Sequence, residues 1–100
     1  MDQKQTFGRP YPGASVKVAY TGTAGTTSAL PETTVAVRVI STTDCFIEIG
    51  LNPTAVADTG LYLPALVPEY FQAQPNAKVS AIQVASAGTL YVTPSSRSSK

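Results

Sequence analysis

The side chains that most often carry out acid–base or nucleophilic chemistry are scarce in this sequence. It has no histidine, which removes the commonest general base and the commonest transition-metal ligand. Its one cysteine, Cys45, cannot form a disulfide within the chain, and no basic residue stands near it in sequence. This setting is typical of a small core or loop cysteine rather than an activated thiolate.

The carboxylates are scattered along the chain rather than grouped. No spacing among them indicates a calcium loop or a glycosidase pair, although two that meet in space stay an alternative. Asp44 is expected to cap its own loop, and the glycines of residues 21–27 do not match a phosphate-binding loop. We therefore predict no enzyme, no catalytic residues, no metal and no cofactor. The six carboxylates are Asp2, Glu32, Asp44, Glu48, Asp58 and Glu69.

The composition favours a protein that packs against other proteins. Only 13% of the residues are charged, well below the roughly 25% of an ordinary soluble domain, whereas serine and threonine supply 22 residues and alanine 13. A net charge of +1 gives no electrostatic reason to bind nucleic acid or an anionic membrane. No apolar run approaches the ~20 residues of a membrane span, and no secretory signal precedes the domain, so synthesis in a reducing cytoplasm is expected.

Two stretches are predicted to form antiparallel hairpins, each with a three-residue loop. In Val35–Leu51, a loop of residues 42–44 would place Val39 opposite Ile47 and Arg38 opposite Glu48, an opposite-charge pair.

In Lys78–Thr93, a loop of residues 86–88 would place Val84 opposite Leu90 and Ile82 opposite Val92. Gly88 would supply a left-handed backbone at the last loop position, and Pro94 would end the ladder.

Shorter strands are predicted at Ser15–Tyr20, Leu61–Leu63 and Glu69–Ala73, and Pro64 and Pro68 should mark a sheet edge. No window has helical periodicity. About seven strands predict an all-β fold, a small antiparallel β-sandwich or jelly-roll-like barrel. The expected division is an extended N-terminal arm at 1–14, the sandwich at 15–94 and a polar tail at 95–100.

Aromatic side chains are the remaining candidates for a binding site. An exposed platform formed by Tyr62, Tyr70, Phe71 and Tyr91 would indicate a carbohydrate-binding module. We favour the alternative that Phe71, with Tyr62, belongs to the core and that tyrosine hydroxyls reach the surface.

Three blocks resemble small virion-associated proteins of tailed bacteriophages. They are V-R-V-I-S-T-T-D-C-F-I-E-I-G, Y-L-P-A-L-V-P-E-Y-F and K-V-S-A-I-Q-V-A-S-A-G-T-L-Y-V-T, within Val35–Thr93. The resemblance implies a structural part of the virion, foremost a capsid decoration or cement protein, and it carries no catalytic residues.

The partners so implied are the major capsid protein or other virion proteins and further copies of the chain, with no nucleic acid and no membrane. Contact residues are expected in the arm and in segment 62–71. The named residues are Phe7, Arg9, Tyr11, Tyr62 and Tyr70. A tail, neck or fibre-attachment component and a carbohydrate- or receptor-binding module stay as alternatives.

Overall fold

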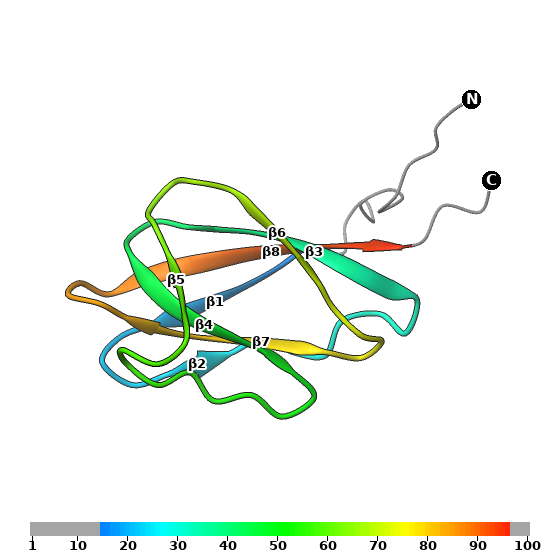
Figure 1. Cartoon of the computed structure of the whole chain (residues 1–100), viewed down its shortest axis with the longest axis horizontal. Helices are drawn as coiled ribbons and strands as arrows, with labels where there is room; N and C mark the ends of the chain where they lie inside the picture. The colour runs from blue at the N-terminus through cyan, green and yellow to red at the C-terminus, as the bar shows by residue number, and fades with distance from the viewer. Residues whose placement is uncertain (1–14, 97–100) are drawn as a thin grey trace.

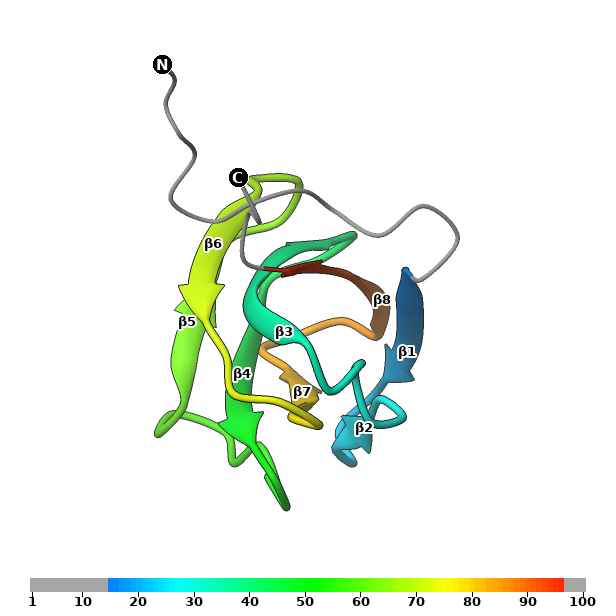
Figure 2. The same ribbon diagram turned by 90° about the vertical axis from the view of Figure 1, so that its right-hand side faces the viewer.

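A computed structural model of the chain describes residues 15–96, which form two four-stranded antiparallel sheets packed face to face (Figures 1 and 2). This confirms the predicted all-β sandwich, and the described residues contain no helix. The predicted arm lies outside the described residues. The strands are β1 (Val16–Tyr20), β2 (Gly25–Thr26), β3 (Thr34–Ser41), β4 (Cys45–Gly50), β5 (Leu61–Leu63), β6 (Glu69–Gln72), β7 (Lys78–Gln83) and β8 (Gly88–Ser96).

The strand order is that of an eight-stranded jelly roll. One sheet, sheet A, has the order β1-β8-β3-β6, and the other, sheet B, has the order β2-β7-β4-β5. Among these eight strands, only β4 and β5 are consecutive within one sheet; every other connection crosses from one sheet to the other. The jelly-roll version of the predicted fold is therefore the one that the chain adopts.

The smaller predicted strands are confirmed. The first strand alternates as expected, with Lys17 exposed between the half-buried Val16 and Val18 and with Tyr20 fully buried. β5 and β6 are both edge strands, one in each sheet, as the flanking prolines indicate. The two-residue strand β2 was missed, because it lies in a stretch whose glycines and threonines are typical of a loop.

Both predicted hairpins are wrong. β3 lies in sheet A and pairs with β6 and β8, whereas β4 lies in sheet B and pairs with β5 and β7. β7 and β8 likewise belong to different sheets. Each of these connections is an arch that spans the sandwich, so Val39 pairs with Val92 rather than Ile47.

The error has a simple physical cause. In a hairpin and in an arch, the apolar side of each strand faces the same core, so both produce the same alternation in the sequence. The core faces of β3, β4 and β8 were therefore predicted correctly, while the hydrogen-bonded partners were not. In β7 the predicted face is wrong as well, because Val79 and Ala81 face the core, whereas Val84 is 44% exposed. Arg38 and Glu48 each stand between core-facing residues of different sheets, and thus lie on opposite outer faces instead of pairing.

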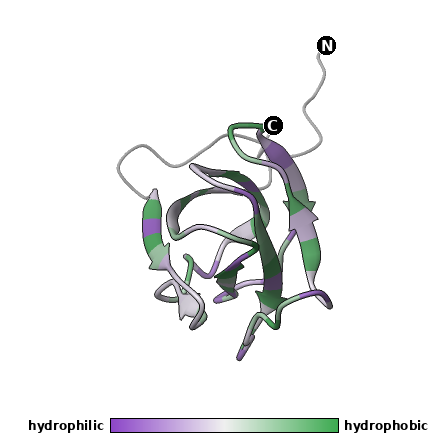
Figure 3. Cartoon of the chain, turned by 90° about the vertical axis from the view of Figure 1, so that its left-hand side faces the viewer, coloured by the Kyte–Doolittle hydropathy of each residue, from purple (hydrophilic) through white to green (hydrophobic). Residues whose placement is uncertain are grey.

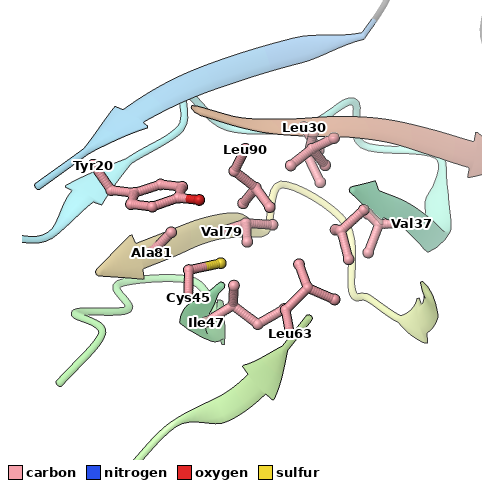
Figure 4. Close-up of a cluster of buried hydrophobic side chains, with 11 residues drawn as sticks. Tyr20, Leu30, Val37, Cys45, Ile47, Leu63, Val79, Ala81 and Leu90 are labelled. Atoms are coloured by element: carbon pink, nitrogen blue, oxygen red, sulfur yellow. The ribbon is translucent and has the colours of Figure 1, made fainter. Parts of the chain in front are cut away.

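The core fills the space between the two sheets (Figure 4). Val37 and Leu90 of sheet A point toward Ile47 and Val79 of sheet B, and all four side chains are completely buried. Cys45 also lies in this cluster with no exposed surface, which confirms its prediction as a core cysteine.

Hydroxyl groups join the two arches at one end of the sandwich; they belong to the buried Tyr20, the half-buried Thr43 and the exposed Thr42. The Tyr20 hydroxyl donates a 2.8 Å hydrogen bond to the backbone carbonyl of Thr43, and Thr43 Oγ1 donates to the carbonyl of Ser86. Thr42 accepts from the Thr89 amide through its own hydroxyl, and its amide donates back to Thr89. We call these residues, with Gly88, the arch lock.

Gly88 is required in the arch lock for space. A Cβ at this position would lie within 3 Å of the hydroxyl oxygens of Thr43, Tyr20 and Thr42. Its φ is not in the left-handed region, so the predicted conformational reason for this glycine is wrong. The prediction that Pro94 ends the ladder is also wrong, because β8 continues to Ser96. Proline lacks an amide proton to donate, and Pro94 lies beyond Val92, the last residue of β8 that pairs with the described part of β1.

Candidate functional site

Two of the five predicted contact residues lie on the surface of the described chain. Tyr62 is 52% exposed on β5, and Tyr70 is 58% exposed on β6. The expectation that Tyr62 belongs to the core is therefore wrong, whereas Phe71 is half-buried and packs against the core as expected. Phe7, Arg9 and Tyr11 lie outside the described residues.

Exposed apolar side chains gather where the edges of the two sheets run side by side. We call this surface the apolar edge; its residues come from β5, from β6 and from the connection between them, which is coloured hydrophobic in Figure 3. Such a concentration along one edge of a small domain commonly marks an interaction site. The members of the apolar edge are Leu61, Tyr62, Leu66, Val67 and Tyr70.

Leu66 is the most exposed member of the apolar edge and has an unusual backbone. Its side chain is 69% exposed, and its φ of 63° lies in the left-handed region, which a leucine rarely adopts. Its amide donates a 2.8 Å hydrogen bond to the carbonyl of Ser41 in β3. A glycine or asparagine would fit this conformation with less strain, so a projecting leucine here points to a role in contact rather than in folding.

Asp44 fixes the connection between β5 and β6. Its Oδ2 accepts a 2.7 Å hydrogen bond from the Tyr62 hydroxyl, and its Oδ1 accepts a 2.8 Å bond from the Ala65 amide. These two donors, the tyrosine first, hold the pKa of the Asp44 carboxyl below its ordinary value, and the same bond raises the pKa of Tyr62. Asp44 therefore caps a connection distant in sequence rather than its own loop, which corrects the prediction.

A hollow opens between the two sheets beside the apolar edge. It has a volume of about 290 Å³ and lies between Leu61 of β5 and Phe71 of β6. Ile47 and Ile49 of β4 also line it. A neighbouring hollow of about 470 Å³ shares Ile49. The site thus combines projecting apolar side chains with room for an apolar side chain of a partner.

The aromatic residues do not form one platform. Tyr62 packs edge-to-face on Phe46, with ring centroids 5.8 Å apart, on the outer face of sheet B. Tyr70 and Tyr91 lie on the outer face of sheet A, and both are exposed. Tyr70 of β6 stands opposite Arg38 of the neighbouring strand β3.

The Cys45 thiol lies in the core of the described chain. Burial raises the pKa of the Cys45 thiol and hides it from solvent, and the hydroxyls of Ser41 and Tyr20 offset this only in part. No group of three or more cysteine or carboxylate side chains in the described chain is placed to hold a metal ion. None of the described segments is a helix long and apolar enough to cross a membrane.

Sequence reasoning located the segment but not its main residue. Segment 62–71 was predicted from its tyrosines and prolines, whereas Leu61, Leu66 and Val67 were not singled out. The available signal was the run Ala65–Leu66–Val67 between two prolines, which is too apolar for an ordinary surface turn.

No known protein family, curated protein or solved structure matches this chain.

Proposed function

We propose that this protein is a non-enzymatic structural component of a tailed-bacteriophage virion, foremost a capsid decoration protein that binds the lattice of the major capsid protein. The observation that carries the proposal is the apolar edge, because five apolar side chains at least 42% exposed along two edge strands and their connection suit a surface covered in an assembly. The resemblance of Val35–Thr93 to small virion proteins is the reason for proposing a phage particle as that assembly.

The rest of the molecule agrees with such a role. The arch lock and the fully buried core suit a rigid scaffold, and the surface is rich in neutral hydroxyls rather than charges. A typical stable interface buries ~800 Å² per partner, so attachment would combine the apolar edge with other contacts. Linked weak contacts raise the effective concentration of one another and hold a particle component firmly. The jelly roll itself does not decide the question, because it serves capsid proteins, lectins and enzymes alike.

The test is to look for the protein in purified particles of the phage that encodes it. We expect quantitative mass spectrometry to find it at a fixed ratio to the major capsid protein, and immunogold labelling to place it over the head. Deleting residues 1–12 should weaken its binding to particles that lack it. Absence from particles overturns the proposal, while a few copies at one vertex or along the tail would favour the neck, tail or fibre alternative.

A carbohydrate-binding role is the second candidate, favoured by Tyr70 and Tyr91 on one outer face. A glycan array with the purified protein would test it. Binding that is lost in both Tyr70→Ala and Tyr91→Ala but kept in Tyr62→Ala would support this role, and no binding to any glycan would exclude it.

A further inference from the structure

The apolar edge has an acidic border. Asp44 bonds to Tyr62, Glu48 follows the β4 residue that pairs with Leu61, and Glu69 begins β6 directly after the connection. Residues 15–96 contain five carboxylates and three basic side chains, a net charge of −2. The two terminal segments, 1–14 and 97–100, contain four basic side chains and one carboxylate, a net charge of +3. The charge of the chain is therefore divided between its body and its ends.

Segment 1–14 has the side chains that such a surface would bind. Phe7, Arg9 and Tyr11 are spaced two residues apart, so an extended backbone places two aromatic rings and one positive charge on the same side. Pro10 and Pro12 exclude a helix and favour an extended backbone for the residues before them. In an extended backbone, the amides of Arg9 and Tyr11 would point to a single side, as pairing with a sheet edge requires.

The attachment point of this segment favours a different copy over its own body. In sheet A, Val16 lies on the row of Val92, Val39 and Glu69, and the chain before it leads toward the end where β8 continues to Ser96. The connection that carries Leu66 is fixed to Ser41, at the opposite end of β3. β1 and β6 are opposite edges of sheet A, with β8 and β3 between them. Segment 1–14 would therefore have to cross both of these strands to reach the apolar edge of its own body.

We propose that segment 1–14 of one copy docks on the apolar edge of a second copy of this chain. An aromatic ring of the segment enters the hollow between Leu61 and Phe71, with the second ring against Leu66 and Arg9 beside the bordering carboxylates. The contact is head-to-tail, because each copy offers a segment and an edge that differ from each other. Such contacts close into rings or continue as chains of copies.

This inference deepens the proposed function, since it names what covers the apolar edge within the decorated lattice. Its test uses only the purified full-length protein in solution. Failure of the test would leave the occurrence of the protein in virions unaffected, and absence from virions would leave self-association unaffected.

The experiment uses sedimentation equilibrium on three proteins: the wild type, a segment variant (Phe7→Ala with Tyr11→Ala) and an edge variant, Leu66→Asn. Asparagine tolerates the left-handed backbone of position 66, and circular dichroism checks that each variant is folded. The matched controls are Gln3→Ala with Gln5→Ala in the segment and Val56→Asn, which replaces a side chain 53% exposed on the loop between β4 and β5.

We expect the wild type and both controls to associate with rising concentration, and each variant to associate at least about tenfold more weakly. Because the segment variant keeps its edge and the edge variant keeps its segment, mixing the two should restore a single 1:1 dimer. A monomeric wild type, association unchanged in the variants, or a mixture that does not form the 1:1 dimer would each overturn the proposal. NMR provides a further check. If the amide chemical shift of Leu66 differs between the wild type and the segment variant by the same amount at every protein concentration, the segment docks on its own body, and the proposal is overturned.

Discussion

The arch lock and the apolar edge depart in opposite ways from the usual placement of polar side chains outside and apolar side chains inside a protein. At the arch lock, a polar group lies inside the fold: Tyr20 is 1% exposed, and its hydroxyl is bonded within the protein. At the apolar edge, leucine, valine and tyrosine side chains are pushed outward, and Leu66 adopts a strained backbone to project. Both regions are held by hydrogen bonds to connections distant in sequence. The arch lock thus bonds polar groups to one another within the fold, whereas the apolar edge leaves apolar side chains exposed and holds Leu66 in a strained backbone.

Substitution of Gly88 should break the arch lock most severely. In Gly88→Ala, the new methyl group meets three hydroxyl oxygens at once, so the Tyr20 and Thr43 bonds must separate. We expect unfolding free energy to fall by about 3 kcal/mol, measured by urea denaturation. Gly50→Ala is the matched control, since no atom lies within 4 Å of its added Cβ. Equal effects at the two positions would show that the close approach at Gly88 is unimportant.

Tyr20→Phe tests the hydrogen bond of the arch lock while keeping the ring in the core. The carbonyl of Thr43 loses its 2.8 Å donor, and the Thr43 amide loses its acceptor. We expect a loss of about 1–2 kcal/mol in the same urea experiment. Tyr91→Phe, at a side chain 44% exposed, should leave stability unchanged. If Tyr20→Phe were also neutral, packing of the Tyr20 ring alone would account for its contribution to stability.

The sequence predicted the core faces of β3, β4 and β8 correctly but not that of β7, and it predicted the strand partners wrongly. Alternation in Val35–Leu51 correctly marked Val39 and Ile47 as core, because burial depends only on period. Pairing of β3 with β8 joins residues about fifty positions apart, and no local pattern encodes that choice. Neither turn had the Asn-Gly or Asp-Gly signal of a tight hairpin, which was the available warning. At the site, the tyrosines and prolines located the segment, whereas the strained exposure of Leu66 depends on tertiary hydrogen bonds.

The apolar edge should respond to substitution in the opposite direction. Leu66→Asn replaces a leucine in the left-handed region by a residue that tolerates it, so unfolding free energy should rise by up to about 1 kcal/mol. Thermal unfolding at low protein concentration, where copies are separate, measures this. Leu61→Asn is the control, because Leu61 is similarly exposed on an ordinary strand backbone and should show no gain. A destabilised Leu66→Asn would mean that the leucine serves folding after all.

The smallest expected effect concerns the bond that fixes the apolar edge. Because the Tyr62 hydroxyl is the main reason that the pKa of Asp44 lies below 3.8, Tyr62→Phe should raise that pKa toward the ordinary value, as followed by carboxyl-carbon NMR. The folded pKa is the depressed one, so the contribution of Asp44 is complete above pH 3.8 and is lost as the pH falls through the folded pKa. Protonation of Asp44 weakens its hydrogen bond with the Ala65 amide, so hydrogen exchange of this amide should become faster as the pH falls. In Tyr62→Phe this change should occur at a higher pH than in the wild type. Tyr70→Phe should change neither titration nor exchange. If the pKa of Asp44 were unchanged in Tyr62→Phe, the Tyr62 hydroxyl would not stabilise the carboxylate, and the hydrogen bond from the Ala65 amide would be the main cause of the low pKa.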